Sequence, residues 1–239
     1  MARTARLAVA GEYHQVLLEG RGTVFQDEAD CAGFLAALSE ELRITPRVAL
    51  VAWILMPASV RLLVIPQEAG ALASLMQGLG RRWVPQYNAR HGLSGSPWTG
   101  RYRSAPVDSD WALRAMRQIE YSAVLNGIAD LPWEYRWSSC AGRILGEPPL
   151  LEMAETEVWT GLGNTPFDRQ SRYQAFLSES ESEAWLLGLE AALRRGSPYG
   201  SADWMDRVGI PASRRPTGRG PGRPRKIREG WISEPLNCF

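Results

Sequence analysis

The chain contains few residues of several kinds, and each shortage excludes a class of protein. Its 239 residues include three cysteines, Cys31, Cys140 and Cys238, which lie far apart and show no C-x-x-C spacing. That distribution argues against a zinc site and against a disulfide framework. It suits a reducing compartment, and we therefore expect a cytoplasmic protein.

Long apolar runs are missing as well. No apolar stretch approaches the roughly 18 residues that a membrane-spanning helix requires, so we expect no membrane partner. Residues 1–7 are not followed by an apolar segment long enough for a signal peptide. Apolar residues still make up 45% of the chain, which is enough for a sizeable core.

Lysine and histidine are scarce. Lys226 is the only lysine, so the other 26 of the 27 basic residues are arginines, whose planar fork suits phosphate contacts. His14 and His91 are the only histidines, and neither has an acidic partner at a recognisable metal-binding spacing. The formal net charge is +1, but residues 207–228 hold eight basic residues and no acidic one.

Apolar patterning is strongest in Val48–Leu55 and Val60–Ile65, which predict two strands joined by a tight turn at Pro57. The other expected elements are, in order, a strand over Glu12–Glu19, a helix from Asp27 to Leu42, a helix over Ala71–Arg90 that Pro85 weakens or kinks, a strand over Arg101–Val107 and a helix over Trp111–Asn126. The order β-α-β-β-α-β predicts an α+β, ferredoxin-like split βαβ fold, with an antiparallel sheet and helices on one face.

The character of the chain changes after residue 140. Residues 141–210 look helical, whereas residues 211–239 are rich in proline, glycine and arginine and lack apolar periodicity. We therefore expect three parts: a sheet domain over residues 1–140, a helical subdomain over 141–210 and a flexible basic tail over 211–239.

Several short motifs stand in a fixed order along residues 12–140. They are Tyr13-His14-Gln15-Val16, Leu55-Met56-Pro57, Pro97-Trp98-Thr99-Gly100-Arg101-Tyr102, Gln118-Ile119-Glu120 and the segment from Pro132 to Ser139. In this order and at these intervals they resemble the REP-associated tyrosine transposases, a single-tyrosine family of HUH transposases. The resemblance implies that residues 1–140 form a transposase-like HUH domain.

The resemblance also implies a chemistry, the cleavage and rejoining of single-stranded DNA. In that family, two histidines one residue apart on a strand hold a divalent metal, and strand side chains at this spacing point to the same face. A helix tyrosine attacks the phosphate and becomes linked to the DNA. A polar residue four positions later completes the metal shell.

In this chain every one of those positions is changed. The two histidines fall on Ser59 and Arg61, the tyrosine falls on Gln118, and the polar residue falls on Ser122. Arginine stays cationic and repels a metal ion, and glutamine is not a nucleophile for phosphoryl transfer. We therefore expect no catalytic residues, no metal site and no cofactor. Mg²⁺ or Mn²⁺ would be required only if activity survives.

Other residues could restore part of the function. Tyr121 lies three positions after Gln118 and could face roughly the same way, as a substitute nucleophile. His14 on the first strand could approach the same sheet face as the lost histidines. Arg61 could hold a DNA phosphate without cutting it, because it places a fixed cation where a metal ligand would stand. Alternatively, Arg61 pairs with a carboxylate.

Arginines and aromatic residues are mixed before and within the last expected strand. The residues concerned are Trp98, Arg101, Tyr102 and Arg103, with a similar group of Arg81, Arg82 and Trp83 on the second helix. This mixture suits single-stranded or hairpin DNA, with phosphates on the arginines and bases stacked on the rings. The alternative is that Trp98 and Tyr102 are packing residues.

The tail contains a motif similar to an AT-hook, Gly222-Arg223-Pro224-Arg225-Lys226. Proline holds an extended backbone, glycine permits close approach, and the arginines can follow a narrow A·T-rich minor groove. Arg214, Arg215 and Arg219 would add phosphate contacts. The alternative is a solubilising tail that binds polyanions without preference.

These observations together predict a DNA-binding, transposase-like protein that is catalytically inactive. We expect it to recognise single-stranded, hairpin or repetitive palindromic DNA. Two alternatives stay open. One is an active metal-dependent tyrosine transposase that nicks and rejoins single strands, and the other is a protein-interaction module or decaying remnant.

Overall fold

A computed structural model describes residues 6–216 of the chain. Four strands form one antiparallel sheet, namely β1 (Tyr13–Glu19), β2 (Val48–Met56), β3 (Ser59–Pro66) and β4 (Arg103–Val107). Their order across the sheet is β2-β3-β1-β4, and the two connecting helices are α1 (Glu28–Ile44) and α2 (Ala71–His91). This is the split βαβ topology. The predicted α+β, ferredoxin-like fold is therefore confirmed.

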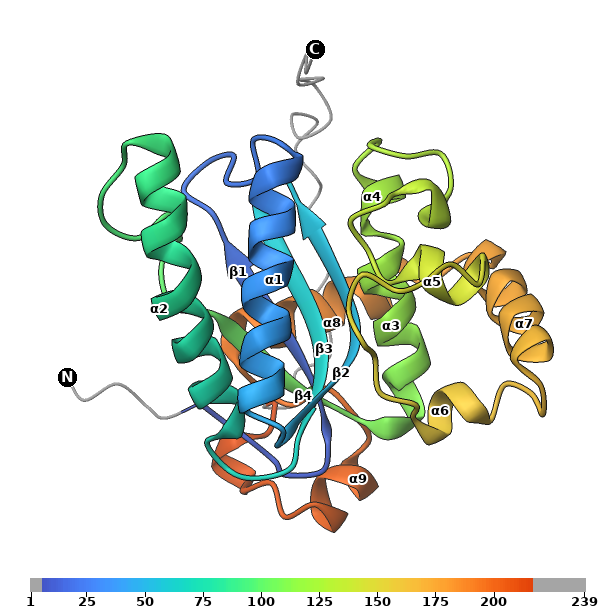
Figure 1. The fold of residues 1–239 in the computed structure, drawn as a ribbon. Helices are drawn as coiled ribbons and strands as arrows, with labels where there is room; N and C mark the ends of the chain where they lie inside the picture. Colours follow the sequence, from blue (N-terminus) through green and yellow to red (C-terminus); the bar gives the residue numbers. More distant parts are fainter. Residues whose placement is uncertain (1–5, 217–239) are drawn as a thin grey trace, which may run out of the picture.

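The helices α1 and α2 lie side by side on one face of the sheet, called here the first face (Figure 1). Alternate strand residues such as Val16, Leu62 and Val64 bury their side chains under these helices. The residues between them point to the second face. Gly78 allows α2 to approach α1 closely, because a β-carbon at this position would collide with the Glu41 carboxylate.

The second face is covered by helices that follow β4. In order, the helices after β4 are α3 (Ala112–Glu120), α4 (Ser122–Leu125), α5 (Cys140–Ile144), α6 (Glu157–Thr160), α7 (Pro166–Ser178), α8 (Glu183–Arg195) and α9 (Ala202–Arg207). The helix α3 packs on β2 and β3, and α8 packs on β4 and β1. Residues of α7 and α8 therefore share one buried cluster with the second face of the sheet.

The predicted helix over Trp111–Asn126 is broken at Tyr121. The ψ angle of Tyr121 is −4°, whereas a continuous α-helix holds ψ at about −42°. The helix α3 therefore ends at Glu120, and α4 begins at Ser122. By contrast, α2 continues without interruption through Pro85.

Backbone segments cover both edge strands of the sheet. On β2, Leu55 N donates to the carbonyl of Trp137 at 2.8 Å, and Ser139 N donates to the carbonyl of Trp53 at 2.9 Å. On β4, Tyr199 N donates to a strand carbonyl at 2.9 Å. The motif that ends at Ser139 thus protects an edge that could otherwise pair with another chain.

A buried ion pair joins the helices of the second face to β2. Glu120 is fully buried at the end of α3 and accepts hydrogen bonds from Arg143 Nε at 3.1 Å and Ser139 Oγ at 2.5 Å. The Tyr173 hydroxyl of α7 also donates to Glu120, at 2.7 Å. Burial raises the pKa of Tyr173, and the Glu120 carboxylate raises it further, so this hydroxyl stays protonated. Arg143 also donates to the carbonyl of Val51, which a bulge in β2 leaves without a strand partner.

His14 is buried on the first face of the sheet. It is paired with Val64 of β3, whose side chain packs under α1 and α2. The imidazole Nδ1 donates to the carbonyl of Glu12 at 2.8 Å, and Nε2 accepts from Val9 N at 3.1 Å. Burial lowers the pKa of His14 to about 4, against the opposing effect of the bond to Glu12.

Cys31 and Cys140 are buried free thiols. Burial raises the pKa of Cys31 to about 12 and also raises that of Cys140, so both thiols are protonated and pack as small apolar groups. Within residues 6–216, no helix combines the length and the apolar character that crossing a membrane requires.

Replacing Glu120 with alanine should lower the free energy of unfolding by about 3–5 kcal/mol, because it leaves Arg143 buried without its counter-charge. The matched control is Glu68→Ala, which removes an ion pair with Arg47 whose two side chains are more than half exposed. The control should cost less than about 1 kcal/mol. Urea unfolding followed by tryptophan fluorescence measures both values. Equal losses would contradict the role assigned to the buried pair.

Replacing His14 with glutamine should weaken the dependence of stability on pH. The unfolded histidine has a pKa of about 6.5, so it takes up a proton between about pH 6.5 and pH 4 while the folded imidazole does not. The free energy of unfolding should therefore decrease as the pH is lowered through this window, by up to about 3 kcal/mol from this group alone. Unfolding free energies at pH 7 and pH 4.5 measure the effect. An identical pH dependence in His14→Gln would show that the imidazole is not held neutral.

Candidate nucleic-acid interface

The positions that the resemblance assigns to catalysis lie on the second face of the sheet. Ser59 and Arg61 are two residues apart on β3, so both side chains point away from α1 and α2. Gln118 of α3 accepts a hydrogen bond at Oε1 from Gln15 Nε2 of β1, at 2.5 Å. The hydroxyl of Ser122 donates to the backbone carbonyl of Gln118 at 2.8 Å. Two of the replaced side chains are thus engaged in bonds that hold α3 and α4 in place.

Arg61 is already paired with a carboxylate. Its Nη1 lies 3.1 Å from Glu190 Oε2 of α8, and its side chain is 17% exposed. Glu190 also pairs with Arg194 at 3.2 Å. Arg103 lies on the same face, two strands away, and is paired with Glu19 at 3.2 Å. Carboxylates of the protein therefore neutralise these guanidinium groups, and the phosphate-binding role of Arg61 stays a prediction.

The residues on this face do not fit a divalent metal ion. In the part of the chain that the structure describes, no three His, Cys, Asp or Glu side chains are grouped closely enough to hold one. The guanidinium of Arg61 repels a cation. His14 cannot join Ser59 and Arg61, because it lies on the first face of the sheet. The expectation that His14 could approach them is therefore wrong.

Tyr121, the predicted substitute nucleophile, lies at the break between α3 and α4. It is half-buried and, together with Gln118, lines a cavity of about 300 Å³. The guanidinium of Arg117 lies 5.3 Å from the centre of its ring. Ser59 and Arg61 do not line this cavity, so Tyr121 does not share it with the positions that the resemblance assigns to the metal ligands.

The first face carries a different group of arginines, called here the arginine cavity. Arg21 and Arg101 are exposed and Arg6 is half-buried, and they line a cavity of about 550 Å³. Within residues 6–216 these three guanidinium groups form no ion pair with a carboxylate.

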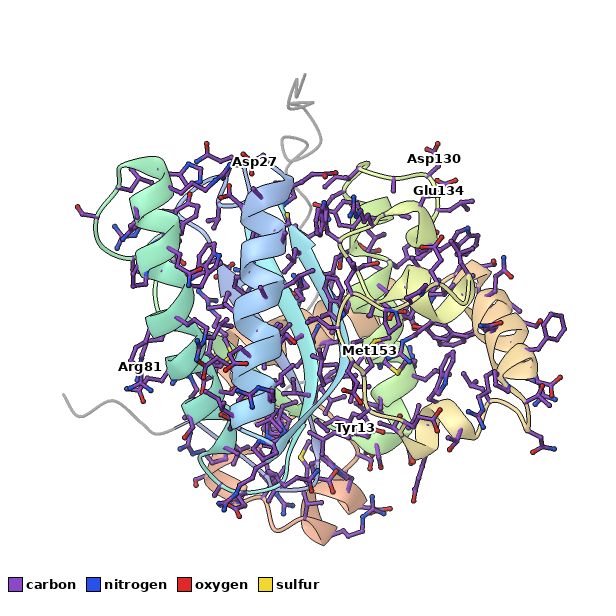
Figure 2. The ribbon with its side chains drawn as sticks, in the orientation of Figure 1. Tyr13, Asp27, Arg81, Asp130, Glu134 and Met153 are labelled. Atoms are coloured by element: carbon purple, nitrogen blue, oxygen red, sulfur yellow. The ribbon has the colours of Figure 1, made fainter. Side chains whose placement is uncertain are left out.

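Arg81, which the sequence grouped with the possible DNA contacts, projects from α2 away from the sheet (Figure 2). Sequence patterns did not identify Arg6 or Arg21, because each stands alone among residues of other types.

Backbone carbonyls hold two of these arginines in place. Arg6 donates from Nε and Nη2 to the carbonyl of Tyr102 at 3.1 and 2.8 Å, and its guanidinium carbon lies 3.9 Å from the centre of the Tyr102 ring. Arg21 Nε donates to the carbonyl of Trp98 at 3.0 Å. Burial lowers the pKa of Arg6; Tyr102 opposes this shift and the positive charge of Arg101 adds to it. The cavity therefore concentrates positive charge in a fixed geometry.

Trp98 and Tyr102 are too buried to offer an open surface on which a base could stack. Trp98 is 6% exposed, and its ring centre lies 5.4 Å from that of Trp83 and 6.2 Å from that of Phe34. Tyr102 is half-buried beneath Arg6. Trp98 is therefore chiefly a packing residue, which is the alternative that the sequence left open.

Only the start of the basic tail lies within the described residues. Arg214 belongs to the short helix η3 (Ala212–Arg214), and Arg215 Nη1 lies 2.6 Å from Asp206 Oδ1. The remaining predicted DNA contacts of the tail lie outside the described residues, namely Arg219, Arg223, Arg225 and Lys226.

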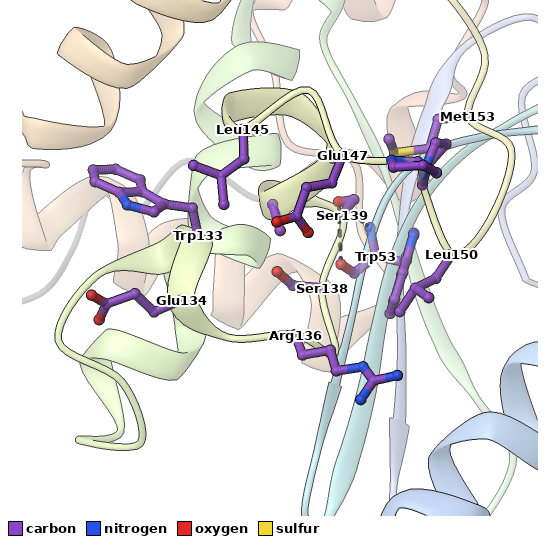
Figure 3. A pocket seen from close by; sticks show the side chains of 14 residues that line it. Trp53, Trp133, Glu134, Arg136, Ser138, Ser139, Leu145, Glu147, Leu150 and Met153 are labelled. Carbon is purple, nitrogen blue, oxygen red and sulfur yellow. Dashed lines mark hydrogen bonds between the residues drawn. The ribbon is translucent and has the colours of Figure 1, made fainter.

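A separate cavity of about 620 Å³ lies beside the edge strand β2 (Figure 3). Trp53 and Trp133 line it, and the indole N–H of Trp53 is buried without a hydrogen-bond partner. Its charged lining residues are Arg136 and two carboxylates, Glu134 and Glu147. Carboxylates repel phosphate, so this cavity suits nucleic acid less well than the arginine cavity does.

Comparison with known proteins identifies the fold. No protein-family model and no curated protein matches the chain. Among solved structures, the chain is similar to a REP-associated tyrosine transposase bound to a REP hairpin, with 14% identity and a TM-score of 0.51 over 65% of this chain and 93% of that chain. A candidate transposase from Deinococcus radiodurans R1 is 26% identical over 50% of this chain and 96% of that chain, but its TM-score of 0.33 is too low to support a conclusion. The first similarity establishes that this chain has a transposase-like fold.

Proposed function

We propose that this protein binds DNA with single-stranded or hairpin segments, including repetitive palindromic sequences, and does not cut it. The arginine cavity carries the proposal, because Arg6, Arg21 and Arg101 have no carboxylate partner within residues 6–216. Guanidinium groups match phosphate oxygens in both charge and geometry. The similar fold of a transposase that is bound to a REP hairpin supports DNA as the partner.

The absence of cutting is inferred from the replaced positions. Arg61 is engaged by Glu190, and Gln118 is engaged by Gln15, so neither side chain can serve as a metal ligand or a nucleophile. We propose that binding needs no metal ion. An active enzyme would have to act through another hydroxyl, of which Tyr121 is the candidate, and a protein-interaction module would bind no DNA.

Labelled hairpin DNA should form a complex with the protein in a gel-shift assay, equally in Mg²⁺, Mn²⁺ or EDTA, with no cleaved strand and no covalent adduct. Replacing Arg21 and Arg101 together with alanine should weaken binding about tenfold at moderate salt, because two phosphate contacts are lost. The slope of log K against log salt should fall by about 1.4. The control is Arg172→Ala, an exposed arginine of α7, which should change little.

Three results would contradict this proposal in different ways. A metal-dependent adduct that disappears in Tyr121→Phe would establish the active alternative. Unchanged affinity in the double arginine variant would remove the arginine cavity from the interface. A protein that binds no hairpin under any of these conditions would belong to the third class, the interaction module or remnant.

We further propose that the tail follows the minor groove of A·T-rich duplex. Replacing Arg223 and Arg225 with alanine should abolish any preference for an A·T tract over a G·C duplex of equal length, because these arginines would occupy the narrow groove. Competition gel shifts measure the preference. A preference that survives in the variant would exclude the AT-hook interpretation.

A further inference from the structure

Two adjoining cavities lie beside residues 96–102, and the second of them is also lined by α2. The arginine cavity is basic, and the second cavity, of about 430 Å³, is lined mostly by apolar side chains such as Met76, Leu79 and Trp83. Both cavities are lined by Arg6, Trp98, Gly100 and Arg101. A charged compartment next to an apolar one matches a ligand with a phosphate at one end and an aromatic ring at the other.

Gly80 keeps the apolar cavity open. It lies inside α2, where glycine is less favourable than alanine, so its presence calls for a reason. A β-carbon at Gly80 would meet no atom within 4 Å, whereas one at Gly78 would collide with Glu41. Gly100 likewise has open space around it, and neither Gly80 nor Gly100 has a positive φ. Neither packing nor backbone geometry therefore requires these two glycines, but both leave room in the cavity.

Arg6 and Arg21 of the arginine cavity still have N–H groups that can donate to a ligand. Arg6 uses Nε and one N–H of Nη2 on the carbonyl of Tyr102, and Arg21 uses only Nε, on the carbonyl of Trp98. Among the described residues their Nη1 groups have no acceptor. Donors that are already held in place lose little conformational entropy when a phosphate binds. They are therefore prepared for an anion rather than merely exposed.

We propose that the two cavities together hold one unpaired nucleotide of the bound DNA, with its phosphate on Arg6, Arg21 and Arg101 and its base in the apolar cavity beside Gly80 and Gly100. This inference rests on the proposed DNA binding and specifies where and how one nucleotide is held. The nucleotide must be unpaired, because a paired base is enclosed in the helical stack and cannot enter a pocket.

The site is separated from the former catalytic positions by the thickness of the sheet. Leu18 lines the apolar cavity and pairs across the sheet with Val60. Val60 stands between Ser59 and Arg61, whose side chains point to the opposite face. A nucleotide held in these cavities is therefore held away from the residues that replace the metal ligands.

The test uses the full chain and two DNA hairpins that are closed by the same non-nucleotide linker, so that neither has unpaired loop bases. They differ only in a single-stranded tail with 2-aminopurine at one position. Wild-type protein should bind the tailed hairpin about tenfold more tightly than the blunt one and should raise the 2-aminopurine fluorescence, because the base leaves its stacked neighbours in the DNA. Gly80→Leu should fill the cavity, bring the affinity ratio close to one and remove the rise in fluorescence. Gln86→Leu places the same side chain at an exposed position of α2 outside the cavity and should behave as wild type.

Thermal unfolding controls for the fold, because leucine favours a helix more than glycine does and Gly80→Leu should unfold no earlier than wild type. Gly100→Leu fills the same space from the loop and serves as a second variant. An affinity ratio and a rise in fluorescence that survive in both filled variants would overturn the nucleotide site. Tight binding of both hairpins without any effect of the tail would also overturn it while sparing the proposed function. Failure of the wild type to bind either hairpin would overturn both.

Discussion

The buried ion pair between Glu120 and Arg143 is the constraint on which the second layer of the molecule depends. A carboxylate withdrawn from water must be matched by donors, and here they come from α5, α7 and the residue before α5. Arg143 also satisfies the carbonyl that the bulge in β2 leaves free. The network therefore joins α5 and α7 to α3, and it fixes α3, with Gln118, against the sheet.

One end of the sheet presents two faces with different electrostatic character. On the second face, Arg61 and Arg103 are matched by Glu190 and Glu19. On the first face, Arg6 is held by a backbone carbonyl and the Tyr102 ring, and Arg21 is held by a backbone carbonyl. A phosphate would have to displace a carboxylate on the second face and would meet no such competitor on the first. The arginines of the first face are therefore free to meet a phosphate, whereas those of the second face are already matched by carboxylates.

Local patterns in the sequence were sufficient for the strands of the sheet and their order, but not for the break at Tyr121. The apolar run Val60–Ile65 predicts a strand, and it follows that Ser59 and Arg61 share a face. The face of His14 depends on pairing register, which no local pattern specifies.

Longer-range features of the site could not be predicted. Glu190 lies 129 positions after Arg61, so their pairing is a property of the packed helices. The pattern around Trp98 is the same for a buried and an exposed ring, and the bonds that orient Arg21 involve carbonyls that every residue carries. Space around Gly80 is likewise visible only once α2 is packed against residues 96–102.

The central claim is that DNA contacts the first face of this end of the sheet, and photo-cross-linking tests it most directly. A hairpin with 5-iodouracil in its single-stranded tail would be irradiated with the full chain, and the cross-linked peptides would be identified by mass spectrometry. We predict cross-links to α2 and to residues 96–103. Cross-links confined to β3 and α3, around Ser59 and Gln118, would place the DNA on the second face of the sheet and contradict the claim.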